Sequence, residues 1–297
     1  MSDRPSSSPA STERPPRSPW LRLIRFGNQT GTALLLLPTC WALVLAARGL
    51  PSWRLLAVFT AGSFLMRSAG VILNDLADQS FDRHVARTKS RPLASGELTR
   101  TQAFVFLALL LAVAGALLVL LNPLTRWLAP VAVALAALYP FAKRFIHIPQ
   151  AILGIAFGWG TIMAWTATRN TIEPQAWIVF AATVLWAIAY DTIYAVQDRD
   201  DDRRIGVKSA ALLFGSALWI AVGLALGLML ALLVLAGLLT EIGWAYYLAL
   251  GAVGIFFAVQ GAALRSRIDP PQAFRMFQAH VWAGAAILAG LVAGFLL

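Results

Sequence analysis

The feature that most constrains this chain is a series of long apolar segments that contain no Asp, Glu, Lys or Arg. Five of them cover residues 101–125, 148–168, 209–240, 242–264 and 276–297. A helix of about 20 apolar residues crosses the ~30 Å hydrocarbon core of a bilayer. Each segment is long enough to do so, and the sequence therefore predicts an integral membrane protein.

Four less regular apolar stretches complete the pattern, at residues 32–47, 55–73, 127–142 and 174–190. Together the segments predict an all-α, polytopic protein with nine transmembrane helices. The first 20 residues are rich in Ser, Pro and Arg and contain no apolar run. We expect residues 1–20 to form a disordered cytoplasmic tail and residues 21–297 to form a single transmembrane domain.

The basic residues follow the topology of the predicted spans. The net charge is +10, which on its own would be compatible with nucleic-acid binding. With a cytoplasmic N-terminus, however, the tail and the loops after the even-numbered helices hold 19 Lys and Arg residues, and the opposite side holds four. This asymmetry satisfies the positive-inside rule. It predicts a lipid bilayer as the partner, no nucleic acid, and cytoplasmic loops after helices 2, 4, 6 and 8.

The few cysteine and histidine residues argue against two other kinds of site. The single cysteine, Cys40, excludes an intramolecular disulfide framework. The three histidines are scattered and lack the paired spacing of a zinc site.

Acidic residues are concentrated in two places. Of 14 Asp and Glu residues, eight lie in the segments 75–82 and 191–202, and each segment follows an apolar span. If the second helix continues beyond the bilayer, Asn74, Asp78 and Asp82 recur every four residues and share a face, which Asp75 joins. In the second segment Asp191, Asp198 and Asp202 are seven and four residues apart, which places them within about 20° of one line on a helix.

Stacked carboxylates of this kind need a cation. Mg2+ takes oxygen ligands and is commonly held by one or two carboxylates together with substrate phosphates. The two acidic faces therefore suggest a site for Mg2+ and a lipid diphosphate, and no glycine-rich phosphate loop competes with this interpretation. The basic residues that we select as phosphate ligands follow cytoplasmic helix ends: Arg91, Lys143, Arg144 and Lys208.

The motifs resemble those of the UbiA superfamily of intramembrane prenyltransferases. The resemblance rests on Asn-Asp-x-x-Asp-x-x-x-Asp at 74–82, Thr-Lys-Ser-Arg-Pro-Leu-Ala-Ser-Gly at 88–96, and Tyr-Asp-Thr-Ile-Tyr-Ala at 190–195 leading to the acids at 198–202. It covers the chain from about Arg22 to its end. Arg67-Ser-Ala-Gly and the Asp-Arg-Asp-Asp-Asp run resemble the 4-hydroxybenzoate polyprenyltransferase branch.

The resemblance implies a nine-helix bundle around a central cavity, in which Mg2+ and polyprenyl diphosphate bind at the cytoplasmic mouth. Carried over by position, it assigns the metal and diphosphate sites to Asn74, Asp78, Asp82, Asp198 and Asp202. It assigns a Tyr-x-x-x-Lys motif to Tyr139 and Lys143. Asp75 and Asp191 also fall on motif positions and are, with Lys143, the candidate catalytic residues. It implies electrophilic alkylation of 4-hydroxybenzoate ortho to its hydroxyl, in ubiquinone or plastoquinone biosynthesis at a bacterial plasma membrane.

Individual roles follow from this chemistry. Lys143 would assist the departing diphosphate, and Asp191 would accept a proton. A guanidinium inside an apolar helix needs a partner, which from burial alone could equally be a contact that holds helices together. The resemblance implies that Arg67, on the face of Asn74, binds the carboxylate of the acceptor. Inward-facing aromatic residues are candidates for stabilising the allylic cation, although packing is the more frequent role of such residues: Phe157, Trp159, Trp165, Trp186 and Tyr190.

Several alternatives stay open. The segment from Arg25 to Gly31 lacks the basic residue and proline that the branch usually carries before the first span. Homogentisate, dihydroxynaphthoate, haem or a glycerol phosphate could therefore be the acceptor. A CDP-alcohol phosphotransferase would need an Asp-Gly and Ala-Arg pattern that is missing after Asp78. A divalent-cation transporter would place its acids near the middle of the membrane rather than at one face.

Overall fold

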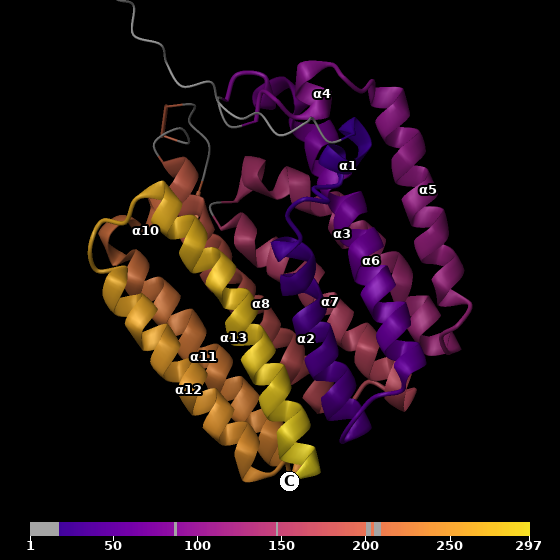
Figure 1. Cartoon of the computed structure of the whole chain (residues 1–297), viewed down its shortest axis with the longest axis vertical. Helices are drawn as coiled ribbons and strands as arrows, with labels where there is room; N and C mark the ends of the chain where they lie inside the picture. The colour runs from indigo at the N-terminus through magenta and orange to yellow at the C-terminus, as the bar shows by residue number, and fades with distance from the viewer. Residues whose placement is uncertain (1–17, 86–87, 147, 200–202, 205–208) are drawn as a thin grey trace, which may run out of the picture.

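The computed structural model describes residues 18–85, 88–146, 148–199, 203–204 and 209–297, and these ranges contain helices but no strand (Figure 1). Nine helical segments in these ranges are long and apolar enough to cross a membrane, as predicted. In chain order the elements are α1 (Pro19–Leu23), α2 (Thr30–Ala47), α3 (Trp53–Asp82), α4 (Pro92–Ser95), α5 (Arg100–Leu118), α6 (Pro123–Phe145), α7 (Pro149–Arg169), α8 (Pro174–Ala195), the 3-10 turn η1 (Val196–Asp198), α10 (Ala210–Phe214), the 3-10 turn η2 (Gly215–Ala217), α11 (Leu218–Thr240), α12 (Trp244–Ala263) and α13 (Pro270–Leu296).

The long helices pack as a bundle of neighbouring antiparallel spans (Figure 1). α2 lies between α3, α7 and α13, and α8 joins α7 to α11. α5 packs mainly on α3 at the outer edge. Because the spans alternate in direction, α3 and α8 run the same way, and both acidic segments lie at the same end of the bundle.

The largest buried side chains occupy the middle of the bundle. Trp41, Trp165, Trp186, Tyr190 and Tyr246 are fully buried there. Glycine also allows close helix contact, since a Cβ at Gly154 of α7 would lie 2.8 Å from the carbonyl oxygen of Val184 on α8. Gly154 and Gly158 thus serve close helix packing, which is typical of membrane helices.

Two helix boundaries differ from the sequence-based expectation. The third span ends at Leu118 because arginines from neighbouring helices bind the carbonyls that follow it: Arg126 donates to Val119 and Leu121, and Arg54 donates to Leu120. The predicted span 209–240 is interrupted at Gly215, whose φ of +48° favours glycine. Asn122 and Pro123, which cap and begin α6, mark the first of these boundaries in the sequence, and Gly215 marks the second.

A short N-terminal helix and the loop after α3 cover the end of the bundle that carries the acidic segments. Leu23 of α1 is fully buried against α3, α4 and α5. Arg22 bonds to Glu97, and this hydrogen bond lowers the pKa of the Glu97 carboxyl. Gln79 of α3 donates to the carbonyl of Leu93 in α4 at 2.8 Å. These contacts fix α1 and α4 next to the acidic end of α3.

Candidate active site in an internal cavity

A cavity of about 680 Å3 lies between α2, α3, α5, α6, α7, α8 and α13. The residues at its polar end are Arg25, Asn74, Asp75, Arg91 and Asp191. Its apolar end is lined by Val58, Phe59, Leu117, Leu118 and Leu121. Phe59 and Asn74 are 15 residues apart on one continuous helix, which corresponds to about 22 Å along its axis. The cavity can therefore hold a long apolar molecule with a polar head.

One stripe of α3 forms a wall of this cavity. Phe59, Ser63, Arg67, Gly70 and Asn74 all line it, and their spacing of three and four residues places them on one face of the helix. Arg67 and Asn74 therefore face the same space, as their spacing predicted.

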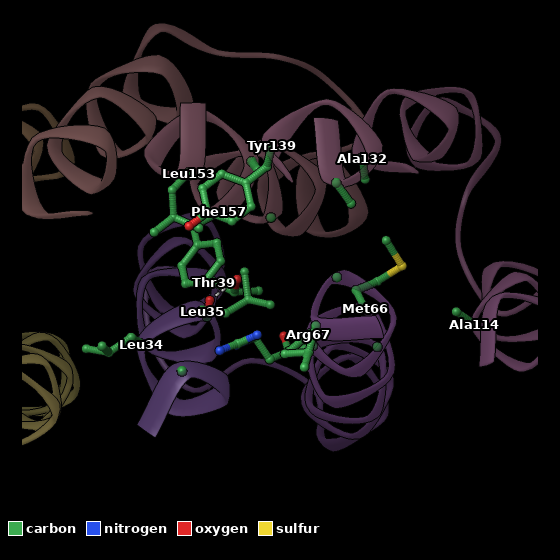
Figure 2. Close-up of a pocket in the computed structure, with 18 of the residues that line it drawn as sticks. Leu34, Leu35, Thr39, Met66, Arg67, Ala114, Ala132, Tyr139, Leu153 and Phe157 are labelled. Carbon is green, nitrogen blue, oxygen red and sulfur yellow. Dashed lines mark hydrogen bonds between the residues drawn. The ribbon is translucent and has the colours of Figure 1, made fainter. Parts of the chain in front are cut away.

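Arg67 reaches from α3 toward α2 in the interior of the bundle (Figure 2). Gly31 makes room for it, since a Cβ at that position would lie 2.7 Å from Nη2. The Nε atom of Arg67 is buried and has no hydrogen-bond partner among the described residues. An unpartnered N–H next to a cavity is what a site for an anionic ligand requires.

Tyr139 lies near an acid of each acidic segment. It lines the cavity from α6, and Figure 2 shows it gathered with Leu153 and Phe157 of α7. Tyr139 lies within electrostatic range of Asp78 on α3 and of Asp191 on α8, as well as of Arg67. The fold thus brings together residues that are far apart in the sequence.

The three acids of the first acidic segment are almost fully buried. The exposed fractions of Asp75, Asp78 and Asp82 are 1%, 2% and 7%. Arg25 donates from Nη2 to both carboxylate oxygens of Asp75, at 2.8 and 2.9 Å. Arg91 donates from Nη1 to Asp75 Oδ1 at 3.2 Å and to Asp82 Oδ2 at 2.7 Å. The carboxylates of Asp75 and Asp82 are therefore bound by arginine.

The second acidic segment lies at a helix end. Asp191 lines the cavity, and Asp198 is half-buried and within electrostatic range of it. α8 ends at Ala195 and continues as the 3-10 turn η1, so the α-helical spacing assumed from the sequence does not hold from Asp191 to Asp198. Each residue of a 3-10 helix turns the chain by about 120°, compared with about 100° in an α-helix. The three residues of η1 therefore rotate the Asp198 side chain by roughly 60° from its position on a continuous α-helix.

Of the other predicted site residues, Asp202 and Lys208 lie outside the described residues, and so do the side chains of Lys143 and Arg144. Of the five aromatic candidates, Phe157 and Tyr190 line the cavity. Trp165 and Trp186 are buried in the core, and Trp159 donates to the carbonyl of Leu128.

Sequence reasoning missed Arg25 and His280. Arg25 lines the cavity and binds Asp75, 50 residues away. The atypical segment from Arg25 to Gly31 was its only signal. His280 of α13 is fully buried, and its Nδ1 accepts a hydrogen bond from Trp186 Nε1 at 2.9 Å. No sequence pattern predicted this buried pair.

The donor atoms at the polar end suit a hard cation. Asn74 and Asp191 present an amide and a carboxylate to the cavity, whereas Asp78, Asp82 and Asp198 lie at the ends of the same helices but are not among the described residues that line it. Among the described residues, no three His, Cys, Asp or Glu side chains converge closely enough to hold a metal ion by themselves. This set fits Mg2+, which usually keeps waters and binds through one or two carboxylates and the phosphates of a substrate.

Comparisons with known proteins agree with the motifs. The model of the UbiA prenyltransferase family matches residues 35–295. A 4-hydroxybenzoate octaprenyltransferase of Pseudomonas aeruginosa (strain LESB58) is 46% identical over 278 residues, which are 94% of each chain. The protein described by the same words from Cupriavidus necator is 46% identical over 276 residues, which cover 93% of this chain and 96% of the relative.

Solved structures share the fold. The apo structure of a UbiA homolog from Aeropyrum pernix K1 superposes with a TM-score of 0.75 at 25% identity, covering 88% of this chain and 97% of the other. The structure of a UbiA homolog from Archaeoglobus fulgidus bound to GPP and Mg2+ gives a TM-score of 0.71 at 17% identity, covering 94% and 100%.

Proposed function

The chain belongs to the UbiA prenyltransferase family, and from this premise we propose that it transfers a polyprenyl chain from polyprenyl diphosphate to 4-hydroxybenzoate. The new bond forms at the ring carbon ortho to the hydroxyl, and Mg2+ is the metal. The observation that carries the proposal is a cavity that joins a long apolar end to two acidic segments and is lined by Arg67, whose buried Nε has no hydrogen-bond partner among the described residues. Relatives described as 4-hydroxybenzoate octaprenyltransferases support this acceptor, and their reaction would supply a precursor for ubiquinone or plastoquinone.

The apolar end of the cavity suits the prenyl tail. Val133 of α6 is 41% exposed and Gly115 of α5 is exposed, yet both also line the cavity. A tail longer than the cavity can therefore pass between α5 and α6 toward lipid. The apolar walls exclude water from the reacting carbon, so that the allylic cation reacts with the acceptor instead.

The polar end suits the diphosphate. In the proposed arrangement, Asn74, Asp78, Asp82, Asp198 and Asp202 hold Mg2+, which when bound neutralises charge on the diphosphate leaving group. Arg91, Lys143, Arg144 and Lys208 add positive charge around the phosphates. Carboxylates at one end of the spans, rather than along their length, favour this arrangement over an ion-conduction path.

The acceptor would lie between Arg67 and Tyr139. The guanidinium of Arg67 would bind the carboxylate of 4-hydroxybenzoate, and the unpartnered Nε is available for this contact. Asp191, also on the cavity wall, would accept the proton released from the phenol or the ring. Tyr190 and Phe157 present aromatic rings to the same space, where a developing cation would meet them.

A purified sample in detergent tests the reaction directly. Incubation with Mg2+, labelled prenyl diphosphate and a panel of aromatic acceptors should give a labelled prenylated 4-hydroxybenzoate. Faster labelling of homogentisate or dihydroxynaphthoate would show that 4-hydroxybenzoate is not the preferred acceptor. If no acceptor were labelled, the proposed prenyl transfer would be wrong.

The protein is a multi-pass integral membrane protein. The bacterial relatives and the asymmetry of 19 to 4 basic residues support a plasma-membrane location with both acidic segments cytoplasmic. With Cys40 replaced by Ala, single cysteines at the exposed positions Ser80 and Arg203 should resist an impermeant thiol reagent in intact cells. Labelling of either from outside would reverse the orientation.

A further inference from the structure

The carboxylate of Asp75 is more heavily hydrogen-bonded than its position in an acidic motif predicts. It accepts three N–H bonds, two from Arg25 and one from Arg91. Arg91 also binds Asp82, so two carboxylates and two guanidiniums form a group of zero net charge. This group needs no cation to be stable in the interior.

The two carboxylates of this group differ in their capacity for a metal. A carboxylate has roughly four lone-pair positions. Both positions on Asp75 Oδ1 are used, and Oδ2 also accepts from Arg25. In Asp82, by contrast, Arg91 binds only Oδ2, so that Oδ1 can still reach a cation. Asp75 is thus the acid of the first segment that is least suited to bind metal.

Both arginines reach the polar end of the cavity with N–H donors to spare. A guanidinium has five such donors. Toward described partners, Arg25 uses its two Nη atoms, for Arg22 O at 3.1 Å and for Asp75. Arg91 uses only Nη1. Both residues line the cavity, so their remaining donors are close to the place where a polar head group would bind.

The backbone on either side of the pair is held in place. The carbonyl of Arg25, whose φ is +55°, accepts from the backbone N–H of Asn28 at 2.8 Å. On the other side, Thr88 Oγ1 donates to the carbonyl of Asp82 at 2.9 Å and anchors the loop that carries Arg91. The guanidiniums are therefore fixed before any ligand binds, which lowers the entropic cost of binding.

We propose that Asp75 is a positioning residue that holds Arg25 and Arg91 as a clamp for the diphosphate of the prenyl donor, and that it is neither a metal ligand nor a catalytic acid or base. The proposal rests on the proposed function. It assigns a binding role to Arg25, because the planar fork of arginine matches phosphate oxygens. The competing role for the pair is purely structural, namely to attach α1 to α3.

The test uses the full chain in detergent and measures two separate quantities. Binding of Mg2+ with farnesyl thiodiphosphate, a poorly reactive donor analogue, gives the donor Kd by calorimetry. Transfer at saturating donor gives the Mg2+ concentration for half-maximal rate. The variants are Asp75→Asn, Arg25→Gln and the double variant, and Asp78→Asn is the matched control from the same helix.

We expect Asp75→Asn and Arg25→Gln each to raise the donor Kd by about 10-fold or more, as loss of a charge-assisted contact does. The Mg2+ concentration for half-maximal rate at saturating donor should stay within about twofold of the wild-type value. The donor Kd of the double variant should be about the same as that of the single variant with the higher Kd. Asp78→Asn, in contrast, should raise the Mg2+ requirement strongly. If Asp75→Asn does not fold, Arg25→Lys keeps the charge but not the fork and should still weaken donor binding.

Three results would overturn the clamp. An Mg2+ requirement that rises in Asp75→Asn as it does in Asp78→Asn would make Asp75 a metal ligand. An unchanged donor Kd together with a lower melting temperature would leave the pair a structural role only. Additive losses in the double variant would show that the two residues act separately. If the wild-type chain bound no donor and transferred no prenyl group, the proposed function would fail, and the clamp with it.

Discussion

The two acidic segments each contain a pair of Asp residues four positions apart, Asp78 and Asp82 in the first and Asp198 and Asp202 in the second, but the two segments begin differently in the structure. The first lies on α3, which continues without interruption to Asp82. The second begins on α8 and leaves it at Ala195 through the 3-10 turn η1. On α3 the helix itself fixes where each acid points. On α8 the end is placed by packing against α13, where Tyr194 and Phe277 have ring centroids 4.7 Å apart.

The surroundings of the two segments differ as well. Arg25 and Arg91 bind Asp75 and Asp82 in the first segment, next to the tightly docked α1 and α4. In the second segment Asp191 borders the cavity and lies near Arg67 and Tyr139. The comparison suggests that the first segment forms a preformed wall for the diphosphate, whereas the second would share the metal through Asp198 and Asp202 and face the acceptor through Asp191.

The largest effect is expected from removing one acid of each segment. Asp78→Ala and Asp202→Ala should each lower the rate of prenyl transfer by on the order of 1000-fold or more, since loss of the metal removes several kcal/mol of charge stabilisation. Chelation of Mg2+ from the wild-type protein should give the same loss. Both variants should elute as folded protein in detergent. Substantial turnover in only one of the two variants would show that a single acidic segment holds the metal, and the proposed sharing of the metal between the segments would then be wrong.

A smaller and more selective effect is expected at Arg67. Arg67→Ala should raise the KM for the acceptor by about 10- to 100-fold through loss of a charge-assisted contact, while the KM for prenyl diphosphate changes little. Arg54→Ala is the matched control, because it removes an arginine from the same helix far from the polar end. Equal loss toward both substrates would mean that Arg67 serves the fold rather than the acceptor.

A smaller effect still should follow from moving the Arg67 guanidinium without removing it. The Cβ of Gly31→Ala would collide with the guanidinium, which can move aside because it ends a flexible side chain. We expect the acceptor KM to rise by about fivefold, less than a full contact is worth, with little change in melting temperature. Gly251→Ala, on α12 away from the cavity lining and with open space around it, should change neither. A normal acceptor KM in Gly31→Ala would place the acceptor elsewhere.

The smallest effect is expected from the ion pair between Arg22 and Glu97, which lies next to the first acidic segment. Arg22 lowers the pKa of Glu97 in the folded protein, so the contact stabilises the fold above the ordinary Glu pKa of about 4.5 and is lost as the pH falls through the lowered value. The pair is exposed, and Glu97→Gln should therefore cost less than about 1 kcal/mol at pH 7. Melting curves at pH 7 and at acidic pH measure this difference. A large loss of prenyl transfer in Glu97→Gln would show that the ion pair between Arg22 and Glu97 is also needed for activity.

Much of the fold could be predicted because its signals are local. The length and apolar character of each segment are sufficient to identify nine spans, and the continuation of α3 to Asp82 follows the four-residue spacing of its acids. The shared face of Arg67 and Asn74 follows from the same spacing. The end of α8 could not be predicted in this way, because nothing in 190–198 differs enough in helix propensity to mark Ala195 as its last α-helical residue.

The sequence alone determined the membrane architecture, the common end of the two acidic segments and the position of an arginine within a span. These properties depend on residues that are neighbours in the sequence, because the free energy of transferring a segment to lipid is a sum over its own side chains and is dominated by the apolar ones. Tertiary structure alone decided that Arg25 binds Asp75 and that Gly31 makes room for Arg67. Such pairs join residues tens of positions apart, and their free energy depends on distances and burial that exist only once the helices have packed.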